Sequence, residues 1–252
     1  MIDDFTACAQ IVERGDPARF RAVMAAPPGV RERLFALYAF NVEIARAPYV
    51  TSEPGIAEIR LQWWIDALGE IAQGGAVHKH EVVVPLALSI TSSQALDLQA
   101  VVEARFHDVY NDPFADGVAL CRYLEATSGT VLEVAAGMLG QGDAAPARAA
   151  GFAQGLANWL RAVPALKAHG KSPLPDESDA AIAALATEGL VALNEARGIV
   201  KTAQPAFYAV AGTRRVLKSA RANPGRVLAG RLEPGPMAES LSLLRAVVLK
   251  SW

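Results

Sequence analysis

Apolar residues recur every three to four positions along almost the whole chain, which is the period of an amphipathic α-helix. Proline and glycine clusters interrupt the pattern, and Asp16 before Pro17 is typical of a helix start. The valine-rich stretch 80–90 contains Pro85 and has no plausible strand partner, which favours a short helix. The pattern predicts longer helices over residues 17–26, 30–47, 54–73, 92–110, 116–139, 145–166, 180–202, 205–222 and 236–252.

The composition is typical of one helical domain. Apolar residues make up 52% of the 252 residues but aromatic residues only 7%, and the abundant alanine favours helices that approach closely. The sequence contains no long linker and no internal repeat. We therefore predict a single all-α domain over residues 1–252.

The charges and the cysteines exclude several classes of function. A net charge of −2 gives no overall attraction to nucleic acid, so no nucleic-acid partner is expected. The two cysteines lack Cys-x-x-Cys spacing and only four histidines are present, which argues against disulfide scaffolds and zinc sites. The sequence shows no targeting signal and no apolar run of membrane-spanning length, so we expect a soluble cytoplasmic protein.

Peripheral contact with a membrane stays open. A basic run on the helix predicted over 205–222 is the segment that would meet anionic lipid, although a solvated helix face is the commoner explanation. The run consists of Arg214, Arg215, Lys218 and Arg221.

Several short motifs, in this order, resemble the squalene/phytoene synthase family. They are Tyr-Ala-Phe at 38–40, Arg-Leu-Gln-Trp-Trp at 60–64, Thr-Ser-Gly-Thr-Val at 127–131, Asn-Trp-Leu-Arg at 158–161 and Lys-Ser-Pro-Leu-Pro at 171–175. The resemblance spans residues 16–222 and implies an isoprenoid-synthase-like helical bundle around a central cavity. In the family, two Asp-x-x-x-Asp motifs hold Mg²⁺ ions that bind prenyl diphosphates, which the enzymes condense head to head.

Both aspartate motifs are missing from this chain. Alignment on the flanking motifs places Ala45 and Tyr49 at the first pair of metal positions, and Ala162 and Leu166 at the second. Mg²⁺ takes oxygen ligands, and none of these four side chains supplies a carboxylate. We therefore expect no metal, no cofactor and no catalytic residue.

Residues 16–20 (Asp-Pro-Ala-Arg-Phe) and 39–45 (Ala-Phe-Asn-Val-Glu-Ile-Ala) resemble one branch of the family, the mitochondrial complex I assembly factors and their α-proteobacterial relatives. This resemblance implies an assembly or accessory role beside a membrane-complex subunit. It also implies a cavity that holds an isoprenoid or lipid chain. The residues matching the family's ligand-lining positions, together with the nearby arginine, are Tyr38, Tyr123, Asn158 and Arg161.

Two alternatives remain beside this hypothesis. The first is an active prenyltransferase in which Glu43, Asp66 or Glu70 holds Mg²⁺ while Arg161 binds the diphosphate. The second is a helical interaction module without a small-molecule site.

Three further groups of residues are better explained without a ligand. The helical spacing of one group favours an exposed helix face; this group is Glu103, His107 and Asp108. The sequence His-Lys-His at residues 78–80 is more typical of a surface turn. Trp63 and Trp64 point about 100° apart on a helix, so one is expected in the core and the other at a cavity or a neighbour.

Overall fold

The computed structural model describes residues 2–51, 53–110 and 112–250, with side chains from Phe5 onward, and these residues form helices and no strands. The all-α prediction is confirmed. The α-helices are α1 (Ile2–Gly15), α2 (Pro17–Met24), α3 (Pro28–Arg46), α4 (Pro54–Gln73), α5 (Val83–Ala87), α6 (Ser92–Arg105), α7 (Gly117–Leu124), α8 (Thr130–Met138), α9 (Ala145–Ala168), α10 (Asp179–Glu195), α11 (Thr213–Ala222), α12 (Gly225–Leu228) and α13 (Pro236–Leu249).

Four other turns of helix connect or interrupt these elements. Three are 3₁₀-helices and one, η3, is a π-helical segment between α7 and α8. They are η1 (Ala47–Tyr49), η2 (Phe106–Asp108), η3 (Glu125–Gly129) and η4 (Gln204–Val210).

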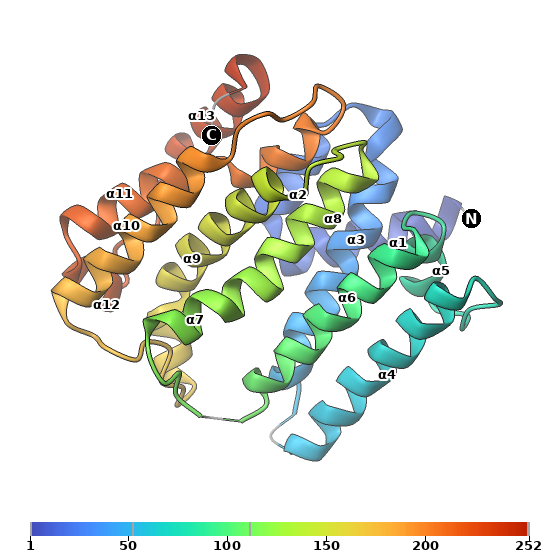
Figure 1. The fold of residues 1–252 in the computed structure, drawn as a ribbon, viewed down its shortest axis with the longest axis horizontal. Helices are drawn as coiled ribbons and strands as arrows, with labels where there is room; N and C mark the ends of the chain where they lie inside the picture. The colour runs from blue at the N-terminus through green and yellow to red at the C-terminus, as the bar shows by residue number, and fades with distance from the viewer. Residues whose placement is uncertain (1, 52, 111, 251–252) are drawn as a thin grey trace.

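The long helices run side by side across the molecule (Figure 1). Helix α4 packs against α6, and α9 packs against η3 and α8 on one side and against α10 on another. Helix α10 in turn packs against α11, while α1 packs on α3. Every side chain of α3 from Leu34 to Val42 is buried, so α3 passes through the core.

Side-chain caps start the helices where the sequence predicts them. The Asp16 carboxylate accepts a hydrogen bond from the backbone N–H of Arg19 at 2.9 Å, and Pro17 opens α2. Thr91 and Gln94 form a reciprocal capping box at α6. The valine-rich stretch is the short helix α5, as predicted.

The structure corrects four predicted boundaries and adds α1, which the pattern did not predict. Helix α10 stops at Glu195 because Ala196 leaves the helical conformation, with ψ at 74°. The left-handed Gly212 (φ 85°) separates η4 from α11. Helix α6 ends at Arg105, with η2 in place of a last helical turn. The predicted helix 236–252 reaches Leu249, and residues 251–252 lie outside the described residues.

The helix predicted over 116–139 contains the π-helical segment η3, and two glycines of α9 lie against it. A Cβ atom on Gly151 would lie 2.6 Å from the Ser128 carbonyl oxygen, and one on Gly155 would lie 2.5 Å from the Ser128 Cβ. The missing side chains let α9 approach η3 closely. This contact brings Tyr123 of α7 near Asn158 of α9, where both line one cavity.

Candidate functional site

A central cavity of about 200 Å³ lies between α2, α3, α6, the α7–η3 segment and α9. Of the residues predicted to line a ligand site or to replace metal ligands, Tyr123, Asn158, Ala162 and Leu166 border it. The charged side chains in its wall, among the described residues, are Arg19 and Arg105, and none is a carboxylate. This set of donors does not fit an Mg²⁺ ion, which takes oxygen ligands.

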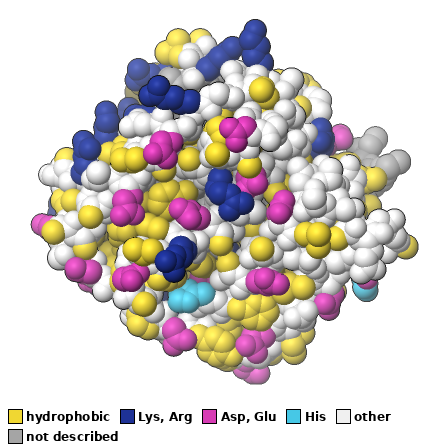
Figure 2. Space-filling view, viewed as in Figure 1, with side chains coloured by type: hydrophobic (Ala, Val, Ile, Leu, Met, Phe, Trp, Pro, Cys, Tyr) yellow, Lys and Arg dark blue, Asp and Glu magenta, His cyan; other side chains and the backbone are white. Residues whose placement is uncertain are grey.

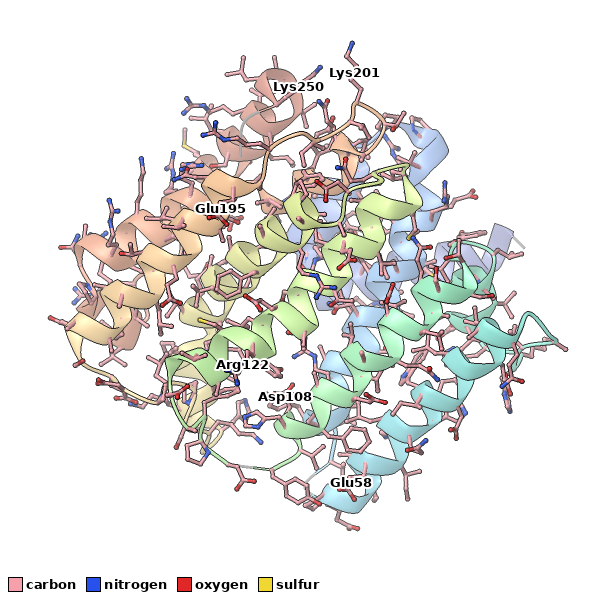
Figure 3. The ribbon with its side chains drawn as sticks, in the orientation of Figure 1. Glu58, Asp108, Arg122, Glu195, Lys201 and Lys250 are labelled. Carbon is pink, nitrogen blue, oxygen red and sulfur yellow. The ribbon has the colours of Figure 1, made fainter. Side chains whose placement is uncertain are left out.

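Arg105 is neutralised inside the protein by Asp108, which lies one turn later in η2 and is labelled in Figure 3. The guanidinium Nη1 lies 3.0 Å from Asp108 Oδ2 and donates to the Tyr123 hydroxyl at 2.6 Å. That hydroxyl donates to both Asp108 oxygens, at 2.7 and 2.8 Å. Asp108 is 5% exposed, so the three side chains form a closed and largely buried network, here called the Arg105 network.

Burial and neighbouring charge shift the pKa values of Tyr123 and Arg105. Burial, with help from Asp108, raises the pKa of Tyr123 well above its usual value, so this phenol stays neutral. Burial alone would lower the pKa of Arg105, but Tyr123 and Asp108 raise it above its usual value. The Asp108 carboxylate is therefore already occupied by an arginine and a phenol.

A second, much smaller space of about 20 Å³ adjoins the network and is bordered by Tyr49, Leu166, Asp108 and Lys171. The Lys171 ammonium donates to the carbonyl oxygens of Asp108 (2.7 Å) and Tyr110 (3.1 Å). Burial, with a contribution from Asp108, raises the pKa of Tyr49 to about 12.

The four substituted metal positions are only partly brought together. Tyr49 and Leu166 border the same small space, while Ala162 and Leu166 border the central cavity. Ala45 is half-buried and borders none of the cavities found among the described residues.

Tyr38 lies under the central cavity and does not line it. Its side chain is 1% exposed, and its hydroxyl has no hydrogen-bond partner among the described residues. The Arg19 guanidinium lies 5.1 Å from the Tyr38 ring and donates to Asp16 and Gln154. Burial raises the pKa of Tyr38 to about 12.

We expect Tyr38→Phe to raise the free energy of unfolding by about 1 kcal/mol, because it removes an unsatisfied buried hydroxyl. Tyr123→Phe is the matched control and should lower the free energy of unfolding, because the Tyr123 hydroxyl bonds to both Arg105 and Asp108. Urea denaturation of the two variants measures the difference. A loss of stability in Tyr38→Phe would show that this hydroxyl has a partner.

A larger cavity of about 630 Å³ lies between α2, α9, the η4–α11 segment and residues 233–243. Asn158 and Ala162 border both this cavity and the central one. Its charged wall combines four arginines with three carboxylates. These are Arg19, Arg21, Arg161, Arg215, Asp16, Glu233 and Glu239.

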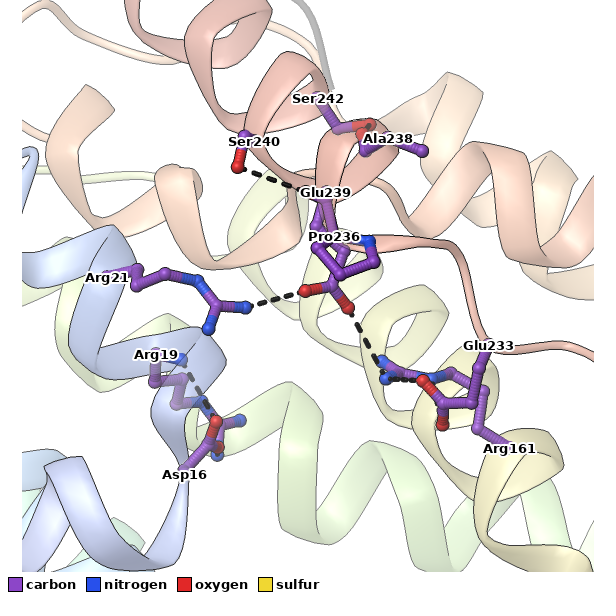
Figure 4. Close-up of polar contacts among 10 residues, drawn as sticks. All are labelled: Asp16, Arg19, Arg21, Arg161, Glu233, Pro236, Ala238, Glu239, Ser240 and Ser242. Atoms are coloured by element: carbon purple, nitrogen blue, oxygen red, sulfur yellow. Dashed lines mark hydrogen bonds and ion pairs between the residues drawn. The ribbon is translucent and has the colours of Figure 1, made fainter.

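Arg161 lines this larger cavity and has carboxylate partners (Figure 4). Its Nε donates to Glu233 at 3.0 Å, and Nη2 bonds to the other Glu233 oxygen and lies 3.7 Å from Glu239. Glu239 is also paired with Arg21 at 2.7 Å. The two glutamates therefore pair with Arg21 of α2 and Arg161 of α9.

The acids proposed for an active enzyme lie on the surface. Asp66 is exposed and accepts from Gln62, and Glu70 pairs with His78 at 2.6 Å. Glu43 lies 3.4 Å from Arg46 on α3. None of the three acids lines a cavity found among the described residues, and the described part of the chain contains no group of three or more His, Cys, Asp or Glu suited to a metal.

The two tryptophans differ in burial as expected, although their rings are in edge contact with centroids 4.9 Å apart. Trp64 packs edge-on against Phe40 in the core, with ring centroids 5.3 Å apart, while Trp63 meets His80 at 5.0 Å. The interpretation of Glu103, His107 and Asp108 as one exposed face is wrong at Asp108, which is buried. His107 instead stacks on Phe114, at 4.1 Å between centroids.

Sequence reasoning did not place Arg105 in the wall of the central cavity, nor did it pair Arg161 with Glu233. The available signal was the spacing of Arg105 and Asp108, which are three residues apart and become an ion pair when a helix ends between them. Glu233 lies 72 positions from Arg161, and no local pattern connects them.

Comparisons with known proteins show the family and the fold. The family model described as squalene/phytoene synthase matches residues 12–238. Among solved structures, a dehydrosqualene synthase in complex with ligand superposes with a TM-score of 0.79 at 16% identity, covering 99% of this chain and 98% of that one. The squalene synthase HpnC from Alicyclobacillus acidocaldarius superposes with a TM-score of 0.71 at 15% identity, covering 87% of this chain and 94% of that one. These likenesses show the fold.

The curated relatives are proteins named NADH dehydrogenase (ubiquinone) complex I, assembly factor 6. The human protein is 27% identical over 162 residues, which cover 62% of this chain and 48% of that protein. The Drosophila melanogaster homolog is 30% identical over 167 residues, covering 62% and 50%. The chain thus spans about half the length of the curated relatives it matches.

Proposed function

Because the chain belongs to the squalene/phytoene synthase family, we propose that it keeps the fold of the synthases without their reaction and serves as an accessory factor in the assembly of a membrane complex. The observation that supports this proposal most directly is the wall of the central cavity. Ala162 and Leu166, which replace the aspartates of the second motif, border it beside Arg19 and Arg105, and no carboxylate of the described residues lines it.

The physical argument concerns the charge of the leaving group. A prenyl diphosphate ionises only if the charge that develops on the diphosphate is stabilised, and Mg²⁺ provides that stabilisation when carboxylates hold it. Asp108 is the nearest buried acid, and Arg105 and Tyr123 already occupy its two oxygens. Arginines alone attract a diphosphate but do not position the metal ions.

The names of the curated relatives support the second half of the proposal. Proteins called complex I assembly factor 6 match this chain from human and from Drosophila melanogaster. By that likeness, the partner of this chain is a subunit of a membrane complex.

We propose that the larger cavity is the binding site for an isoprenoid or lipid chain. Pockets that hold small organic molecules usually measure about 300–1,000 Å³. The central cavity, at about 200 Å³, is below that range, and the cavity lined by Arg21 and Arg161 is within it at about 630 Å³.

Two experiments test the proposal. Purified protein incubated with farnesyl or geranylgeranyl diphosphate and Mg²⁺ should release no diphosphate and form no condensed hydrocarbon, while a dehydrosqualene synthase assayed in parallel does both. Turnover above the protein-free background would refute the non-catalytic half of the proposal.

The assembly half is tested by complementation. This chain, given a mitochondrial targeting sequence, is expressed in human cells that lack complex I assembly factor 6. We expect complex I activity to recover in part, and the Asp108→Ala variant to restore less because it is less stable. Normal expression without any recovery would count against the assembly role.

A further inference from the structure

The last helix, α13, exposes a continuous apolar stripe to solvent. Met237, Leu241, Leu244 and Val248 are 88%, 49%, 57% and 63% exposed. Their spacing of four, three and four residues puts them on one side of the helix. Scattered exposed apolar residues are common on protein surfaces, but a row of four large ones along a helix indicates a contact surface. We call these four residues the α13 stripe.

The opposite side of α13 is attached to the protein, which fixes the stripe in its outward position. Glu239 pairs with Arg21 of α2 and lies near Arg161 of α9 (Figure 4). Ala246 is fully buried, and α13 packs against η4. The helix is therefore held by one face while its most apolar face has no partner among the described residues.

The part of the chain that contains the stripe is strongly basic. Residues 196–250 contain ten lysines and arginines and two glutamates, out of 24 basic and 26 acidic residues in the chain. This segment therefore has a formal charge of +8, whereas the rest of the chain has −10.

The charge separation is visible on the surface. Figure 2 shows Lys and Arg side chains gathered along the edge that carries α11 and α13, with hydrophobic side chains between them at the top. Lys201 and Lys250 lie at that same edge in Figure 3. Arg245 lies beside the stripe on α13 and is exposed.

We propose that α13 is the membrane-contacting element of this protein, and that its stripe inserts among the headgroups of an anionic bilayer while the basic residues of 196–250 bind the lipid charges. An amphipathic helix in the membrane plane buries its apolar face by several ångströms, and lysines and arginines near it add electrostatic attraction. Among the described residues, no helix is both long enough and apolar enough to cross a bilayer. This proposal stands independently of the assembly role.

The charges favour a lipid surface over a second copy of the chain. Two copies that met through their stripes would bring two segments of charge +8 together, and like charges at an interface oppose association. An anionic bilayer matches both the apolar row and the basic border.

Vesicle flotation with the full chain tests the proposal. Vesicles of phosphatidylcholine alone are compared with vesicles containing 30% phosphatidylglycerol. The protein should bind the anionic vesicles at least tenfold more tightly, and 0.5 M NaCl should remove most of this preference. This salt comparison uses the unmodified protein and does not depend on any variant.

Two double variants distinguish membrane binding through the α13 stripe from nonspecific hydrophobic binding. Leu241→Ser with Leu244→Ser should weaken binding to anionic vesicles at least tenfold. Ile59→Ser with Leu96→Ser, which changes exposed apolar residues on α4 and α6, should leave it unchanged. Circular dichroism and light scattering check folding and oligomeric state. Binding to neither kind of vesicle, equal effects of the two double variants, or a dimer dissociated by Leu241→Ser with Leu244→Ser would overturn the proposal.

Discussion

Replacing Asp108 with alanine is expected to lower the free energy of unfolding by about 3–5 kcal/mol, because the substitution leaves the Arg105 guanidinium buried without a counter-ion. The Asp108 side chain is 4% exposed and that of Arg105 is 15% exposed, so water replaces little of the lost interaction. The Tyr123 hydroxyl loses its acceptor as well. Urea denaturation of both proteins measures the difference.

Two controls identify the cause of the loss. Asp112→Ala removes an exposed aspartate four positions later and should change stability by no more than about 0.5 kcal/mol. The double variant Arg105→Met with Asp108→Leu removes both charges and should recover most of the loss. Recovery would show that the unpaired charge, and not the missing volume, destabilises Asp108→Ala.

The metal dependence of the same measurement distinguishes an ion pair from a metal ligand. We expect Asp108→Ala to lower the free energy of unfolding by the same amount in EDTA and in millimolar Mg²⁺, because Arg105 already balances the charge of the carboxylate. A loss of stability that appears only in the presence of Mg²⁺ would assign Asp108 to a metal site.

The substitution Gly151→Ala is expected to have the second large effect. It should lower the free energy of unfolding by about 2 kcal/mol. The new Cβ would lie 2.6 Å from the Ser128 carbonyl oxygen and 2.9 Å from the Gly129 Cα. Both are backbone atoms, so neither moves aside by a rotamer change. The variant should push α9 away from η3 and disturb the wall shared by Tyr123 and Asn158.

The matched control is Gly29→Ala in the first turn of α3, where nothing lies within 4 Å of the new Cβ. The free energy of unfolding of that variant should rise by about 0.5–1 kcal/mol, because alanine favours a helix more than glycine does. Thermal melts of both variants suffice. Similar stability changes for the two would contradict the close contact between α9 and η3.

Local pattern was enough to predict most helices and the start of α2 at Asp16 and Pro17. The pattern failed at Gly212, because a glycine within a helical pattern is compatible with both a continuing helix and a left-handed break. The π-helical segment η3 depends on contacts with α9, so its own sequence does not determine it.

The sequence predicted wall residues of the central cavity but did not predict that Asp108 lies buried beside it. The substitutions at Ala162 and Leu166 follow from alignment, and both residues do border the central cavity. Treating residues 92–110 as one helix placed Asp108 on an exposed face. The helix ends at Arg105, and the turn of η2 carries Asp108 inward against Tyr123.

Calorimetric titration of the protein with farnesyl diphosphate, in EDTA and in millimolar Mg²⁺, tests the central claim most directly. With arginines and no carboxylate of the described residues around the central cavity, Mg²⁺ should leave the affinity unchanged or weaken it by screening the diphosphate. Binding at least tenfold tighter in Mg²⁺ would contradict the account, because it would require a metal site that these side chains do not provide.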